Sequence, residues 1–236
     1  MPNVFKQVNL SSDREEEYDR LTFPIFWELA TNQPQSGVST MDCIEYHDVA
    51  LKESGVLREG QTDVWFKDLV PNVPFSFSPL TSPKFRHLPL EELPAGAISG
   101  FSLTTVSINT QIYLPYLQSQ LLSLGATFIR RHLTHIREAF TLTSSPPAAV
   151  INATGILAYK LGGVEDKDIY PTRGQTILVR NECSKMYFRS AERLEEEPTY
   201  IIPRRFGGGT ILGGCRQHNN WYLLLFALHA YIFKER

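Results

Sequence analysis

The segment NTQIYLPYLQSQLLSLGATFIRRHL, residues 109–133, decides the fold because its apolar pattern changes from helical to strand spacing. Apolar side chains recur at helical spacing in its first half, at Tyr113, Leu117, Leu121 and Leu124. Gly125 is the residue type that commonly follows a helix C-terminus, and ATFIRRHL (126–133) predicts a strand after it. Beyond a polar turn, AAVINATG (148–155) predicts a second, fully buried strand. A helix between two strands indicates an α/β protein.

The sequence before this segment predicts one helix followed by short strands and loops. The acidic start and apolar spacing from Asp13 to Ala30 predict an amphipathic helix, which Pro24 is expected to kink or split. Its apolar positions are Tyr18, Leu21, Ile25 and Leu29. Residues 41–49 and 64–70 are strand-like, and the prolines between residues 71 and 96 exclude a long helix there.

The last third predicts β-structure, with the strand-like stretches GQTILVR (174–180), TYIIP (199–203) and GTILGG (209–214). The glycines at 207–209 predict a hairpin turn, because Gly adopts positive φ without strain. A phosphate loop would need a strand before the glycines and a helix after them. The apolar run 221–233 is shorter than the roughly 20 residues that span a bilayer, so it predicts a buried terminal helix or strand.

Composition and charge narrow the function classes. The 236 residues are 42% hydrophobic and 20% charged, the net charge is −2, and the sequence pI is about 6.3, so nothing indicates a nucleic-acid or membrane partner. The three cysteines predict neither a disulfide framework nor a metal site, and they favour a reducing compartment. His132 and His135 would face opposite sides of a strand, so we expect no metal there. Thr154 and Gly155 end a predicted strand, where a ligand contact and an ordinary loop exit both fit.

Five stretches, in one order along the chain, resemble the middle portion of the flavin-dependent D-amino-acid oxidase family, and most of all its fungal members. They are DVWFKDLVPN (63–72), SINTQIYLPYLQSQLLSLGATFIRRHL (107–133), VINATG (150–155), RGQTILV (173–179) and TYIIPR with GGGTILGG (199–214). The resemblance covers about residues 13–221. It implies a mixed α/β (α+β) fold with a partial FAD-binding, Rossmann-like domain and a β-rich substrate-binding domain.

The resemblance also implies domain boundaries. Residues 1–40 and 107–172 would belong to the FAD-binding domain, and residues 41–106 and 173–236 to the substrate domain, with a divergent tail at 222–236.

The resemblance further implies a set of site residues and a reaction. Tyr200 matches a pocket tyrosine whose hydroxyl binds the substrate carboxylate, and Tyr187 is the nearest match to a second pocket tyrosine. Leu133, Thr154 and Gly155 match positions beside the FAD. Members of the family oxidise D-amino acids with oxygen to 2-oxo acids, ammonia and hydrogen peroxide. Some form homodimers, and many are peroxisomal; without the C-terminal signal a cytoplasmic location is expected.

The sequence departs from the family pattern at both ends. The Gly-rich turn that holds the pyrophosphate and the arginine that binds the substrate carboxylate have no match, as in a truncated member. We therefore expect the chain alone to bind FAD weakly or not at all and to show little or no oxidase activity. The alternatives are a related D-aspartate, glycine or amine oxidase, for which Arg189 and Arg193 are candidate specificity residues, and a non-catalytic interaction module of the same fold.

Overall fold

The computed structural model describes residues 12–57, 60–69, 85–190 and 198–221. These residues form two compact units, which we treat separately. Unit 1 comprises residues 1–127 and 175–215, and unit 2 comprises residues 128–174 and 216–236. The predicted terminal element at 221–233 and Arg193 lie outside the described residues, apart from Trp221.

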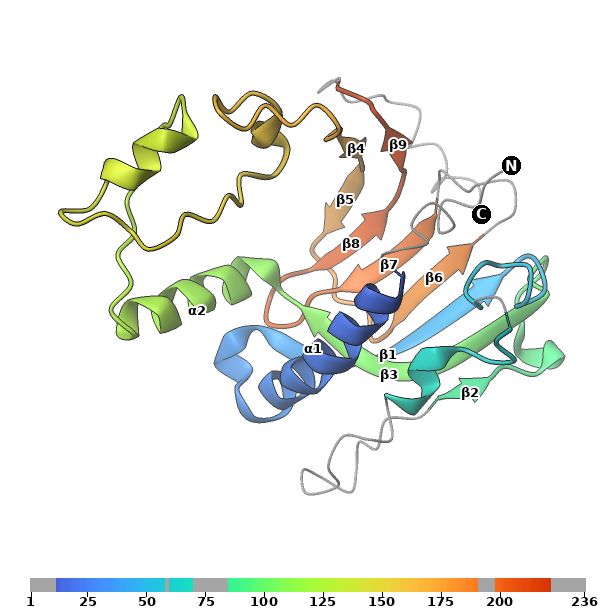
Figure 1. The fold of residues 1–236 in the computed structure, drawn as a ribbon. Helices are drawn as coiled ribbons and strands as arrows, with labels where there is room; N and C mark the ends of the chain where they lie inside the picture. The colour runs from blue at the N-terminus through green and yellow to red at the C-terminus, as the bar shows by residue number, and fades with distance from the viewer. Residues whose placement is uncertain (1–11, 58–59, 70–84, 191–197, 222–236) are drawn as a thin grey trace. The chain divides into compact units, whose positions relative to one another are not determined.

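Unit 1 is built on a mixed seven-stranded sheet in the order β2-β3-β1-β6-β7-β8-β5 (Figure 1). The strands are β1 (Val38–His47), β2 (Arg86–His87), β3 (Ser99–Ile108), β5 (Thr176–Val179), β6 (Met186–Ser190), β7 (Thr199–Pro203) and β8 (Thr210–Gly213). Only β1 and β6 pair in parallel, and the other neighbours are antiparallel. With its helices this sheet gives the α/β fold that the sequence predicts.

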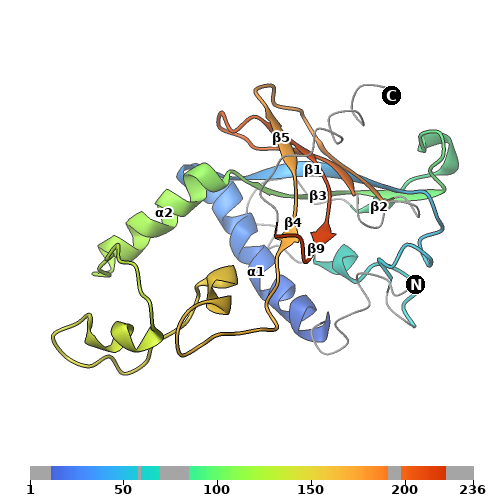
Figure 2. The same cartoon turned by 90° about the horizontal axis from the view of Figure 1, so that it is seen from above.

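Helix α1 (Ser12–Asn32) packs along β1 and β3 on one face of the sheet (Figure 2). It runs through Pro24 as one helix, so the predicted split is wrong. The predicted apolar stripe is also wrong, because Tyr18, Leu21 and Ile25 are exposed. Trp27 is buried instead, with Phe23 beside it at a ring distance of 5.8 Å. The large aromatic side chains therefore set which face of α1 meets the sheet.

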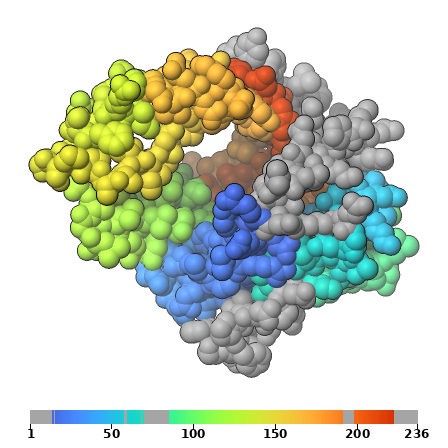
Figure 3. Space-filling view, viewed as in Figure 1, coloured from blue at the N-terminus to red at the C-terminus, as the bar shows by residue number. Residues whose placement is uncertain are grey.

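The segment predicted as a strand at 64–70 folds instead as the 3-10 helix η3 (Trp65–Asp68). Its Phe66 ring lies 5.6 Å from that of the fully buried Phe101 on β3. The Arg20 guanidinium of α1 lies 5.1 Å above the Trp65 ring, and α1 and η3 lie side by side in the space-filling view (Figure 3). Thus α1 and η3 cover the same face of the sheet, the one that carries Phe101. Two further 3-10 helices are η2 (Pro34–Ser36) and η5 (Leu90–Glu92).

The hairpin between β7 and β8 confirms the predicted turn at residues 207–209. Gly207 and Gly209 have φ values of 76° and 68°, in the left-handed region that favours glycine. The Arg204 side chain donates two hydrogen bonds, of 3.1 and 2.6 Å, to the Gly208 carbonyl. Asn109 donates from its amide nitrogen to the Arg205 carbonyl at 3.0 Å, which ties the turn to the end of β3.

Helix α2 (Thr110–Ser123) confirms the predicted helix at the start of the deciding segment. Residues 126–133 and 148–154, however, form no strand and pair with none, so both predicted strands are wrong. Ile151, expected in the core, is 89% exposed. The physical reason is that a strand forms only on a paired ladder, and no described strand lies beside either segment.

Unit 2 has little regular structure in its described residues. It contains two 3-10 helices, η6 (Ile136–Thr141) and η7 (Gly155–Tyr159), and the two-residue pair β4 (Thr172–Arg173) and β9 (Gln217–His218). The His135 ring caps η6 by accepting the Arg137 backbone N–H at 3.1 Å. Among the described residues no group of His, Cys, Asp and Glu gathers as a metal site would require, and no helix has the length and apolar character to cross a membrane.

Candidate functional site

Strand register places Tyr200 in a row of directly paired residues across the sheet of unit 1. The row contains one residue from each of six neighbouring strands: Phe101 (β3), Glu45 (β1), Phe188 (β6), Tyr200 (β7), Gly213 (β8) and Thr176 (β5). Paired residues on adjacent strands point to the same face, so these six share one face of the sheet. This set is called the Tyr200 row below. It lies on the face that η3 covers at Phe101.

The Tyr200 ring is held between an aromatic neighbour and a glycine pair. Phe188 lies at a ring distance of 6.2 Å on one side. On the other side a Cβ atom added to Gly213 or Gly214 would overlap the Tyr200 ring and its hydroxyl oxygen. The ring therefore lies directly against the backbone of these glycines, and only glycine leaves room for it. The Gly214 N–H donates to the Pro198 carbonyl at 2.7 Å, which fixes that backbone next to the start of β7.

Tyr187 lies on the opposite face of the sheet from Tyr200. It pairs with Ile201 and with Ile44, one position away from the Tyr200 row on each strand. Tyr46 is on the same face, where burial, and next the neighbouring Tyr187, raises the pKa of its hydroxyl. The structure therefore does not bring the two tyrosines together, and Phe188 is the neighbour of Tyr200. The catalytic roles of both tyrosines stay predictions.

Arg189, a candidate for the recognition of acidic substrates, also lies on the Tyr187 face. Its side chain donates to the Asp48 carboxylate at 2.8 Å and to the Ala95 carbonyl at 3.1 Å. It thereby joins the ends of β6 and β1, and its guanidinium is engaged in structural contacts.

An ionisable pair, the half-buried Glu45 and the fully buried His47, lies on the Tyr200 face of β1. His47 is fully buried, and its Nε2 lies 3.4 Å from the Glu45 Oε1 atom. Neither His47 nitrogen has a hydrogen-bond partner in the described part of the chain. Burial raises the pKa of Glu45 to about 7 and lowers the pKa of His47 to about 4, the latter against a smaller opposite effect of Asp48. Both groups are therefore largely uncharged near pH 6.

Cys43 is on the same face, and its thiol is unreactive as a nucleophile. Burial, and next the charges of Glu45 and Asp42, raises the pKa of its thiol to about 12. The thiolate needed for nucleophilic chemistry is therefore not formed at neutral pH.

The residues predicted to contact FAD lie in unit 2. Thr154 is exposed, and its hydroxyl donates to Asn152 at 2.8 Å. Gly155 has φ 56°, and a Cβ atom added there would meet nothing within 4 Å. Leu133 is half-buried and lies outside any helix or strand. Open backbone at Gly155 and the hydroxyl at Thr154 fit one edge of a cofactor, which a larger side chain would obstruct. These residues supply few of the contacts that a dinucleotide requires.

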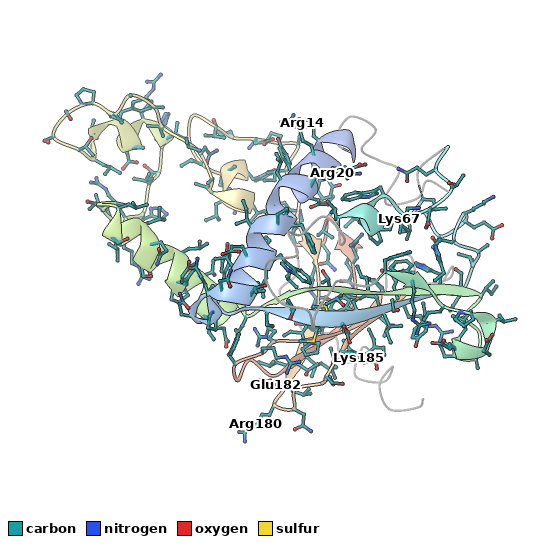
Figure 4. The ribbon with its side chains drawn as sticks, turned by 90° about the horizontal axis from the view of Figure 1, so that it is seen from below. Arg14, Arg20, Lys67, Arg180, Glu182 and Lys185 are labelled. Atoms are coloured by element: carbon teal, nitrogen blue, oxygen red, sulfur yellow. The ribbon has the colours of Figure 1, made fainter. Side chains whose placement is uncertain are left out.

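Figure 4 shows how charged side chains divide between the two sides of the sheet. Arg20 and Lys67 lie with α1 and η3 on one side, and Arg180 and Glu182 lie on the other. Sequence reasoning missed Glu45, His47 and Phe188. The signal for Glu45 and His47 was available, because two ionisable residues two positions apart on a strand share a face with the apolar Met41 and Cys43.

Comparisons with known proteins agree with the resemblance. Residues 80–230 match the family model described as FAD dependent oxidoreductase (DAO). The chain is 33% identical to a D-amino-acid oxidase of Schizosaccharomyces pombe over 92% of its own length and 56% of that protein. It is 35% identical to a D-amino-acid oxidase of Fusarium vanettenii, over 90% and 58%. A D-aspartate oxidase of Talaromyces thermophilus is 32% identical, over 86% and 49%. The chain spans about half the length of these relatives.

Proposed function

Because the chain belongs to the D-amino-acid oxidase family of FAD-dependent oxidoreductases, we propose that it serves the oxidation of D-amino acids by oxygen to 2-oxo acids, ammonia and hydrogen peroxide. The observation that carries the proposal is the position of Tyr200, whose ring lies between Phe188 and the glycine backbone on one face of the sheet. A phenol fixed in this way is preorganised to bind one end of a small ligand.

In the proposed reaction the chain's own residues bind and orient the substrate. The Tyr200 hydroxyl donates a hydrogen bond to the substrate carboxylate, and Phe188 offers apolar surface to the side chain. Leu133, Thr154 and Gly155 would contact the FAD, through backbone atoms at Leu133 and Gly155 and through the hydroxyl at Thr154. When bound, FAD supplies the acceptor for the hydride that leaves the substrate Cα. Unit 1 needs no strong base for this step, since its role is to hold the Cα–H bond in line.

A D-aspartate oxidase activity is the second candidate, because relatives that carry this name match the chain at 32% and 35% identity. The Tyr200 row favours substrates without an acidic side chain. Apart from Tyr200, the one ionisable residue in the row is Glu45, which is itself acidic. A carboxylate on the substrate side chain would be repelled by the ionised Glu45 carboxylate.

The test is reduction of added flavin by the purified chain. With FAD in excess, we expect slow reduction by D-alanine and none by L-alanine, together with release of hydrogen peroxide. Excess FAD is required because the cofactor candidates in unit 2 supply few contacts. Reduction that does not distinguish the two alanine enantiomers, or no reduction at saturating FAD, would contradict the proposal. The second result would favour the non-catalytic interaction module.

A further inference from the structure

We infer that Glu45 is a specificity residue that selects D-amino acids with a cationic side chain. The inference rests on the proposed function, because it takes the Tyr200 row as the surface that binds the substrate. It concerns the side-chain end of the substrate, for which Tyr200 alone has no selectivity.

Strand register places Glu45 in line with Tyr200. Glu45 pairs with Phe188, and Phe188 pairs with Tyr200, so the three residues stand side by side on three adjacent strands. The Tyr200 ring leans over Gly213 and Gly214, so its hydroxyl lies above the next strand, β8. Three strand spacings of about 4.8 Å place this hydroxyl roughly 14 Å from Glu45 along the row. Phe188 fills the interval with an apolar surface.

This spacing matches the length of a cationic amino acid. Extended lysine places its ammonium group roughly 8 Å from its carboxylate oxygens. A hydrogen bond of about 3 Å to Tyr200 at one end and a contact of about 3 Å with Glu45 at the other bring the span to roughly 14 Å. A linear D-amino acid with a terminal cation thus spans the row, with its methylene groups along Phe188 and its cation at Glu45.

The Glu45 carboxyl group accepts no hydrogen bond from the described part of the chain. Its side chain is 24% exposed, so a ligand can reach it. Among the described residues its one close ionisable contact is the His47 Nε2 at 3.4 Å, and this contact lacks hydrogen-bond geometry. No lysine or arginine side chain of the described residues pairs with it, whereas Asp48 and Asp63 each have a cationic partner. A largely desolvated carboxyl group without a donor is stabilised when a ligand brings one.

His47, on the same face of β1 as Glu45, is completely buried. The His47 ring lies 5.8 Å from the Phe101 ring and is closed to solvent. A ligand cation therefore meets Glu45 and not His47, and the aromatic residues Phe101 and Phe188 flank the carboxyl on both neighbouring strands. An apolar surround strengthens an ion pair at its centre.

The experiment compares ligands that differ only at the side-chain terminus. The purified 236-residue chain is titrated by NMR at pH 8, where a Glu45 carboxyl with a pKa of about 7 is mostly ionised. The ligands are D-lysine, its neutral counterpart D-norleucine and D-glutamate, without added FAD so that no ligand is oxidised. We expect D-lysine to bind at least about tenfold more tightly than D-norleucine, as for a hydrogen bond to a charged group. D-glutamate should bind more weakly than D-norleucine.

Two variants make the result specific. Glu45→Gln should remove the preference for D-lysine and leave D-norleucine binding within about twofold. The matched control is Asp42→Asn, because Asp42 is an exposed carboxylate on the same strand but on the opposite face, and it should keep the preference.

Three outcomes separate this inference from the proposed function. Equal binding of D-lysine and D-norleucine, or a preference that survives Glu45→Gln, overturns the inference and leaves the proposed function intact. An equal loss of both ligands in Glu45→Gln also overturns it, because Glu45 would then contact the part that they share. Failure of every D-amino acid to bind contradicts the proposed function, and the inference with it.

Discussion

The sheet of unit 1 and the unpaired segments at residues 126–133 and 148–154 carry similar apolar sequences but have different environments. Phe101 and Met41 on the sheet are almost completely buried, whereas Ile151 in VINATG is 89% exposed. The sheet strands pair with one another, while residues 148–154 have no strand partner among the described residues. An apolar run therefore specifies a strand only where a ladder is present to receive it. The candidate substrate face lies in the paired region, and the candidate cofactor contacts lie in the unpaired one.

The largest expected effect is on stability in the sheet. Phe101→Ala removes a fully buried ring that contacts Phe66, Phe85 and His47, so we expect unfolding free energy to fall by about 3–5 kcal/mol. Ile151→Ala, at an exposed position in unit 2, should change it by less than about 0.5 kcal/mol. Urea unfolding followed by circular dichroism measures both. Equal losses at the two positions would break the comparison.

The next effect concerns the glycines beneath Tyr200. Gly213→Ala places a Cβ atom in steric overlap with the Tyr200 ring, so we expect a loss of about 2 kcal/mol as the ring is displaced. In Gly155→Ala, in unit 2, the added Cβ atom contacts no other atom. The expected loss of stability is about 1 kcal/mol, from the strain of a positive φ. The same unfolding measurement compares them, and a more harmful Gly155→Ala would show that the Tyr200 ring is not held by these glycines.

The sequence predicts the locally determined elements and misses those that depend on strand pairing. Helix α2, strand β1 and the β7–β8 hairpin were predicted correctly, because periodicity and turn glycines are local signals. The two strands at 126–133 and 148–155 were not, because their formation depends on pairing partners that local sequence does not reveal. The relation of Tyr187 to Tyr200 depends on sheet register, where a shift of one residue moves a side chain to the other face.

A smaller effect tests the buried pair through pH. In Glu45→Gln, His47 is the one member of the pair that still titrates, and its folded pKa of about 4 lies below the ordinary 6.5. The unfolded chain then binds the extra proton, so stability should fall as pH drops from 6.5 to 4. In His47→Gln the raised pKa of Glu45, about 7 against 4.5, makes stability fall as pH rises from 4.5 to 7.

In the wild-type chain this pair should change the free energy of unfolding little between pH 4.5 and 6.5. Folding favours the protonated form of Glu45 and the deprotonated form of His47, so their effects on the pH dependence offset each other. Each variant slope is at most about 1.4 kcal/mol per pH unit. Urea midpoints at several pH values measure the slopes. Parallel pH profiles in the wild type and both variants would mean that neither group is buried as the sheet places it.

The smallest effect distinguishes the two tyrosines. Tyr200→Phe should weaken D-alanine binding by roughly 0.5–1.5 kcal/mol, the usual worth of one hydrogen bond, without changing the affinity for FAD. Tyr187→Phe should leave D-alanine binding unchanged if the substrate lies on the Tyr200 face, since its side chain points to the opposite face. NMR titration with D-alanine measures the affinity of each variant. A loss in Tyr187→Phe alone would move the substrate to the other side of the sheet.

The most direct test of the contrast between the two regions is amide hydrogen exchange along the purified chain. The account predicts slow exchange in β1, β6, β7 and β8 around the Tyr200 row, where neighbouring strands hold the backbone N–H groups. It predicts fast exchange at residues 126–133 and 148–154, which lack strand pairing. Equally slow exchange in those two segments would contradict the account, because it would show that they are paired strands and that the candidate cofactor edge is already formed.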